Sequence, residues 1–156
     1  MERKTQIHAE DGKQDILITR EFDLPLELLF RAYAEPELVS QWMGTRVLHI
    51  DNRPQGGYAF ETKDKDGNVM FAAQGTIHAF VPDQMIVRTF EMAHAGFGVQ
   101  LEYLEFEALG EETSKLSMQT IFRSVALRDA QMKLPFAQGL NWAHGRLEEI
   151  VRQLVR

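Results

Sequence analysis

The sequence predicts an α+β fold, in which one curved antiparallel sheet wraps around a long C-terminal helix. One observation is an apolar stripe at helical spacing near the C-terminus, made of Phe136, Leu140, Ala143, Leu147, Ile150 and Leu154. A second is the series of short β-type segments, separated by turn residues, that fills residues 45–123. Such a sheet needs its apolar face covered, and the C-terminal helix is the only helical pattern long enough to cover it.

The N-terminal part of the chain predicts one strand and two short helices. Residues 1–14 are polar, and we expect them to be flexible or to add an edge strand. Residues 15–22 are rich in β-branched and aromatic side chains, which predicts the first strand. Residues 23–33 predict a helix, Glu35-Pro36 interrupts it, and residues 36–42 predict a second helix.

The remainder predicts six more strands before the long helix. They occupy residues 46–51, 58–63, 69–80, 85–92, 99–109 and 115–123. Asp66-Gly67 is a hairpin signal, Gly75 predicts a bulge or bend inside its strand, and residues 93–98 predict a mobile loop. Residues 128–134 lead into the long helix. The predicted order is therefore β-α-α-β6-α, in one domain that spans residues 1–156.

The composition argues against several functional classes. The chain has no cysteine, which excludes disulfides and thiolate metal sites. Its 17 basic and 23 acidic residues give a net charge of −6, which argues against a nucleic-acid partner. There is no membrane-spanning apolar run and no signal-peptide core, so we expect a cytoplasmic protein without a membrane span. The five histidines show no metal-ligand spacing, and we expect neither a metal nor a cofactor.

Four stretches of the sequence resemble a known family. They are ITREFDLPLELLFRAYAEPELVSQWMG, DNRPQGGYAF, residues 75–90 and RDAQMKLPFAQGLNWAHGRLEEIVRQL. In this order and spacing they resemble the START-like (birch-pollen-allergen type, SRPBCC) helix-grip superfamily. Within it they are most similar to the branch named for the C-terminal domain of the activator of heat-shock-protein ATPase. The sequence departs from that branch at Met43, Thr45 and Arg88, where the branch commonly has Trp, Pro and an apolar residue.

The resemblance implies a helix-grip fold with a cavity between the sheet and the long helix. Combined with period-two alternation on the strands, it predicts a ligand-binding interior lined by Trp42, Tyr58, Phe60, Arg88, Phe90, Met92, Glu102, Leu104, Phe106, Met118, Phe122 and Trp142. Aromatic and Met side chains suit an adaptable apolar pocket. The alternative is an ordinary packed core, because cores show the same periods. On the helix, Gly139, Ala143 and Gly145 would leave room for a ligand, the alternative being close packing of helix and sheet.

Arg88 is the residue whose position most needs an explanation. It shares one face of its strand with Ile86 and Phe90, so it points inward if they are buried. Glu102 points inward by the same alternation, on a strand that should neighbour the strand of Arg88. Arg88 is therefore a polar anchor for a ligand, one half of a satisfied ion pair, or a residue at the sheet's rim with its head group in water.

Three functional hypotheses follow. The first is binding of a small hydrophobic or amphipathic molecule, with Arg88 and Glu102 as polar anchors. The second, implied by the resemblance alone, is a protein-interaction domain that contacts a chaperone; a homodimer through the helix face or a sheet edge is also possible. The third is an enzyme acting on a cyclic or aromatic substrate through Arg88 or His144. Against the third, His144 is alternatively a packed histidine, and the sequence carries no known catalytic motif.

Overall fold

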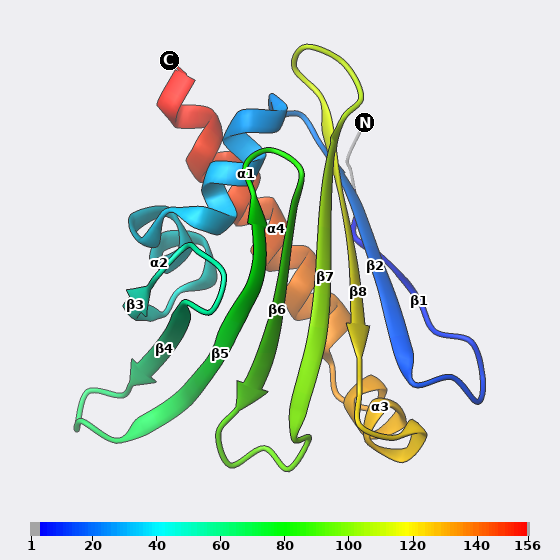
Figure 1. Ribbon diagram of the computed structural model, residues 1–156. Coiled ribbons are helices and arrows are strands. Elements are labelled where there is room, and N and C mark those ends of the chain that lie inside the picture. Colours follow the sequence, from blue (N-terminus) through cyan, green and yellow to red (C-terminus); the bar gives the residue numbers. More distant parts are fainter. Residues whose placement is uncertain (1–3, 156) are drawn as a thin grey trace.

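The computed structural model describes residues 4–155, in which an eight-stranded antiparallel sheet curves around a long C-terminal helix (Figure 1). The strands are β1 Gln6–His8, β2 Asp15–Phe22, β3 Arg46–Ile50, β4 Gly57–Lys63, β5 Val69–Val81, β6 Met85–Met92, β7 Val99–Ala108 and β8 Ser114–Ile121. Their order in the sheet is β1-β2-β8-β7-β6-β5-β4-β3. The helices are α1 Leu26–Ala34, α2 Pro36–Met43, α3 Val125–Met132 and α4 Phe136–Arg152, followed by a 3-10 turn, Gln153–Val155. The predicted α+β class is confirmed.

The structure adds one strand and one helix to the predicted order. In the described part of residues 1–14, β1 forms an edge strand that pairs with β2 and places Ile7 opposite Ile18. Helix α3 was not predicted. Its residues carry no apolar stripe, and the only buried side chain in it belongs to Arg128. Its start is nevertheless marked by a capping residue, Ser124, whose hydroxyl accepts a hydrogen bond from the backbone N–H of Leu127.

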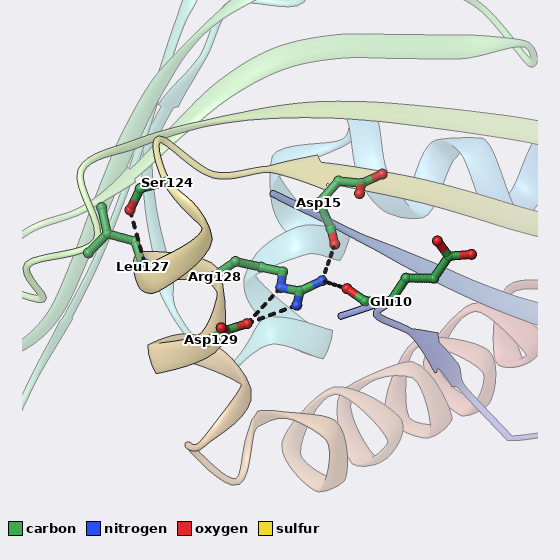
Figure 2. Close-up of polar contacts among 6 residues, drawn as sticks. All are labelled: Glu10, Asp15, Ser124, Leu127, Arg128 and Asp129. Carbon is green, nitrogen blue, oxygen red and sulfur yellow. Dashed lines mark hydrogen bonds and ion pairs between the residues drawn. The ribbon is translucent and has the colours of Figure 1, made fainter. Parts of the chain in front are cut away.

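Arg128 attaches α3 to the hairpin formed by β1 and β2, as Figure 2 shows. Its Nη1 donates to the backbone oxygen of Glu10 at 2.7 Å and to that of Asp15 at 3.2 Å. Its Nη2 pairs with the Asp129 carboxylate at 2.8 Å. The Arg128 side chain is only 4% exposed, and it satisfies two carbonyl groups that no strand pairing reaches. A buried arginine therefore fixes α3, in place of an apolar stripe.

Strand β5 is irregular, as predicted, but at a different point. The register shift with β6 falls between Ile77 and Ala79. Gly75 serves another purpose, because a Cβ atom there would lie 1.9 Å from the backbone oxygen of Thr89 and 2.6 Å from the Tyr58 ring. Glycine allows this close approach of backbone and ring.

The apolar core is divided into two clusters. The larger one joins the sheet to α1 and to the second half of α4, and it includes Phe30, Phe106 and Leu147. The rings of Phe30 and Phe106 meet edge to face with centroids 5.0 Å apart. The smaller cluster lies between β4, β5 and α2 and consists of Val39, Tyr58, Phe60, Ala73 and Ile77. The C-terminal half of the long helix is thus firmly packed.

Candidate functional site

The two halves of α4 pack differently against the rest of the protein. In the second half, His144, Leu147 and Val151 are fully buried. In the first half, residues 136–143, no side chain is buried. The stripe residues Phe136, Leu140 and Ala143 contact the larger core cluster but remain only half-buried. The first half of the helix is therefore incompletely packed against the sheet.

The inward side chains of β6 that follow the buried Ile86 show the same incomplete packing. Arg88, Phe90 and Met92 are half-buried, whereas inward residues of β7 and β8 such as Leu104 and Phe106 are buried. Figure 1 places the end of β6 and the start of α4 in the same half of the molecule. Both elements thus carry half-buried apolar side chains in that half of the molecule.

Four polar side chains lie near one another at inward positions of three neighbouring strands. They are Arg88 on β6, Gln100 and Glu102 on β7, and Thr120 on β8. Arg88, Glu102 and Thr120 stand opposite one another across the three strands, and Gln100 lies two residues before Glu102. Gln100, Glu102 and Thr120 are 3%, 7% and 5% exposed. We call these four residues the polar cluster; apolar residues such as Leu104 and Met118 adjoin it on the same face.

Arg88 and Glu102 form an ion pair inside this cluster. The Nε of Arg88 donates to Oε1 of Glu102 at 2.9 Å, and the two side chains are 14% and 9% exposed. The guanidinium carbon of Arg88 lies 4.9 Å from the centroid of the Tyr58 ring, a cation–π contact. Of the three alternatives for Arg88, the ion pair is confirmed, and a head group in bulk water is excluded.

The polar cluster keeps hydrogen-bonding capacity that the described residues do not use. The bond to Glu102 is the only hydrogen bond that the Arg88 guanidinium makes with the described residues. It uses Nε, so the two terminal nitrogens have no hydrogen-bond partner among these residues. The Nε2 of Gln100 is buried and has no partner among them. A buried donor without a partner costs about 1–3 kcal/mol, so such groups usually face water or a ligand.

A second polar network ties the N-terminal segment to α4. The Thr5 hydroxyl lies 2.6 Å from Nδ1 of His144, and the Thr5 backbone N–H donates to Oδ1 of Asn141 at 2.9 Å. Nη1 of Arg20 also donates to Oδ1 of Asn141, at 3.0 Å. The Tyr33 hydroxyl lies 3.1 Å from Nε2 of His144. The network closes the seam between α4 and the β1–β2 edge of the sheet.

His144 is a structural residue at the centre of this network. It is 0% exposed, and both ring nitrogens have partners. Burial, and secondarily the charge of Arg20, lower the pKa of His144 to about 3. The ring is therefore neutral, and the packed-histidine alternative is confirmed.

Most of the predicted site residues lie on the inner side of the sheet. Those buried in the two core clusters are Trp42, Tyr58, Phe60, Leu104, Phe106, Met118 and Phe122. The rings of Trp42 and Phe106 both pack on Tyr33, with centroids 5.0 Å and 5.7 Å away. Phe90 packs half-buried against the smaller cluster. Contact of any of these residues with a ligand stays a prediction.

The expected position of Trp142 is wrong. Its side chain is 63% exposed and stacks on Arg146, whose guanidinium carbon lies 5.2 Å from the ring centroid. Two residues beyond Leu140 correspond to a rotation of about 200° around the helix, which carries Trp142 to the outer face. Gly145, five residues beyond Leu140, falls on that face as well, so it leaves no room beneath the helix.

Two members of the polar cluster, Gln100 and Thr120, were not among the predicted site residues. The signal for them was present, because both lie an even number of positions from a predicted inward residue on the same strand. Tyr33 and Thr5 had no such signal, since their contacts with His144 join segments 111 and 139 residues apart.

The described residues contain no group of three or more His, Asp and Glu side chains placed to hold a metal ion. In the same part of the chain, no helix combines the length and the apolar character that a membrane crossing requires.

Comparison with known proteins identifies the family. A family model described as Activator of Hsp90 ATPase homolog 1-like protein matches residues 23–152. A solved structure from Mycobacterium smegmatis is similar with a TM-score of 0.82 at 16% identity, covering 94% of this chain and 96% of its own. One from Rhodobacter sphaeroides has a TM-score of 0.85 at 17% identity, covering 96% and 99%.

An HSP90 activator from Plasmodium falciparum has a TM-score of 0.56 at 18% identity, covering 69% of this chain and 72% of its own. No curated protein matches the sequence. Identities this low establish the shared helix-grip fold alone. The match to the family model covers most of the sequence, and the chain therefore belongs to the family of Activator of Hsp90 ATPase homolog 1-like proteins.

Proposed function

We propose that this protein binds a small amphipathic molecule between the inner face of the sheet and the first half of α4. The observation that carries the proposal is the polar cluster, in which the Gln100 amide and the terminal nitrogens of Arg88 lack partners among the described residues. A ligand that supplies hydrogen-bond partners there would remove the cost of those unpaired groups.

The apolar part of the ligand has surfaces to bind as well. Phe136, Leu140 and Ala143 on the helix, and Phe90 and Met92 on β6, are apolar side chains that stay half-buried. Covering apolar surface contributes about 25 cal/mol for each Å² removed from water. Apolar walls with a few convergent polar groups are the usual composition of a small-molecule site.

Filling the space under the helix tests the location. We expect the uncharged fluorescent probe N-phenyl-1-naphthylamine to bind the protein, and Ala143→Phe to weaken that binding at least tenfold by occupying the inner stripe. Ala137→Phe is the matched control, because Ala137 is an exposed residue of the same half of α4. Equal binding by the wild-type protein and the Ala143→Phe variant would contradict this location.

A second candidate function is contact with a chaperone ATPase. It is favoured by the family match over residues 23–152 and by the structural likeness to an HSP90 activator. An assay of chaperone ATPase turnover with and without this protein tests it, and turnover unchanged at saturating protein would remove the candidate.

A further inference from the structure

We infer that the polar end of the ligand is an uncharged group that both accepts and donates hydrogen bonds, as an amide does, and is not a carboxylate. This inference rests on the proposed function and specifies the chemistry of its site. It follows from the charges and the unused hydrogen-bonding atoms of the polar cluster.

The charge of the cluster is already balanced. Arg88 is paired with Glu102 at 2.9 Å, and the two side chains together carry no net charge. A ligand carboxylate bound to the terminal nitrogens of Arg88 would lie beside the Glu102 carboxylate, in surroundings with little water to screen the repulsion. Tyr58, which stacks on Arg88, stays neutral, because burial raises the pKa of its hydroxyl.

The nearest other inward cation is too far away to compensate a ligand carboxylate. Arg20 lies on β2, which is separated from β6 by β8 and β7. Three strand spacings of about 4.8 Å place the two backbones about 14 Å apart. Arg20 also donates to Asn141 in the network at the β1–β2 edge.

The unused atoms of the cluster include both donors and acceptors. The donors are the terminal nitrogens of Arg88 and Nε2 of Gln100. The acceptors are Oε2 of Glu102 and the hydroxyl of Thr120, neither of which bonds another described residue. Glu102 stands opposite Arg88 on one side and opposite Thr120 on the other, so donors and acceptors are close together. A group with one carbonyl oxygen and one N–H matches this arrangement without adding charge.

Matched pairs of probes that differ in charge test the inference. The two pairs are decanamide with decanoate and 2-naphthamide with 2-naphthoate, each tested at pH 8. Binding is followed in a Trp142→Phe protein, which leaves the buried Trp42 as the only tryptophan. The wild-type cluster should bind the amide of a pair about tenfold more tightly than the carboxylate, which corresponds to one hydrogen bond gained without a buried like charge. Equal or tighter binding of the carboxylate overturns the inference.

Two further variants sharpen the test. Glu102→Gln leaves Arg88 without its counter-ion, so the preference should reverse towards the carboxylate. Gln100→Leu should weaken amide binding about threefold to tenfold. The control is Gln74→Leu, because Gln74 is an exposed residue of β5. If Glu102→Gln folds and still prefers the amide of each pair, the inference is overturned. If Glu102→Gln does not fold, the comparison of amide with carboxylate binding by the wild-type cluster decides alone.

The test also separates this inference from the proposed function. Binding of some probes with a preference for carboxylates overturns the inference and leaves the proposed function standing. Binding of none of the four probes overturns both.

Discussion

The Arg88–Glu102 pair should behave as a unit in the stability of the fold. Glu102→Leu leaves a guanidinium in the interior without a counter-ion, and Arg88→Met leaves a carboxylate. Breaking a buried pair from one side costs about 3–5 kcal/mol. We expect the lower end, about 3 kcal/mol, for Glu102→Leu, because the Tyr58 ring still contacts Arg88.

The distance supports this magnitude. Two unit charges about 4 Å apart attract by about 4 kcal/mol at an effective dielectric constant of about 20. The side chains are 14% and 9% exposed, so solvent screens the attraction weakly. Replacing both residues, as in Arg88→Met with Glu102→Leu, removes the charges together and should change the free energy of unfolding by less than about 1 kcal/mol.

Urea and thermal unfolding, followed by circular dichroism, measure the cycle. A loss of about 3 kcal/mol should lower the Tm by about 6–12 °C in a domain of this size. Glu105→Leu is the matched control, because Glu105 is exposed on the outer side of the same strand. The reasoning is refuted if Glu102→Leu costs less than about 1 kcal/mol, or if the double variant loses as much as the two single variants together.

Three other predictions concern packing and pH. Arg128→Met leaves the Asp15 carbonyl without a donor and leaves the Glu10 carbonyl with only the 3.3 Å bond from the Lys13 N–H. It should lower the free energy of unfolding in urea by about 2 kcal/mol; unchanged stability would contradict it. Gly75→Ala should lower the free energy of unfolding by about 3 kcal/mol, because the new Cβ would meet the Thr89 oxygen. Gly139→Ala has open space around its Cβ and should raise the free energy of unfolding by up to about 1 kcal/mol. Similar effects at both sites would contradict the packing argument. His144 has a pKa of about 3 when folded and about 6.5 when unfolded, so the unfolded state binds its proton first as the pH falls. Stability should therefore drop by about 2 kcal/mol between pH 6.5 and pH 5, and His144→Gln should remove that drop; urea unfolding at both pH values decides.

Local patterns were sufficient for most of the secondary structure and for the pairing in the polar cluster. Strand β2 has the predicted bounds, because it is rich in β-branched and aromatic residues, among them Ile16, Ile18 and Phe22. The Arg88–Glu102 contact was predictable because a short loop joins β6 to β7, which makes the strands antiparallel neighbours, and alternation turns both side chains inward. Trp142 could have been placed correctly too, since its position relative to the stripe assigns it to the outer face.

The sequence by itself thus determined the α+β class, the strands from β2 to β8, and the side of the sheet to which most of their residues belong. Only the tertiary structure decided that the second half of α4 has buried side chains while the first half has none. It alone also decided that the segment around Thr5 contacts α4 through His144. Periodicity is a property of neighbouring residues along the chain, whereas the space between two surfaces depends on side-chain volumes from distant segments. For the same reason no local pattern predicted the role of Arg128, which holds α3 in place through carbonyl groups more than 110 positions away in the sequence.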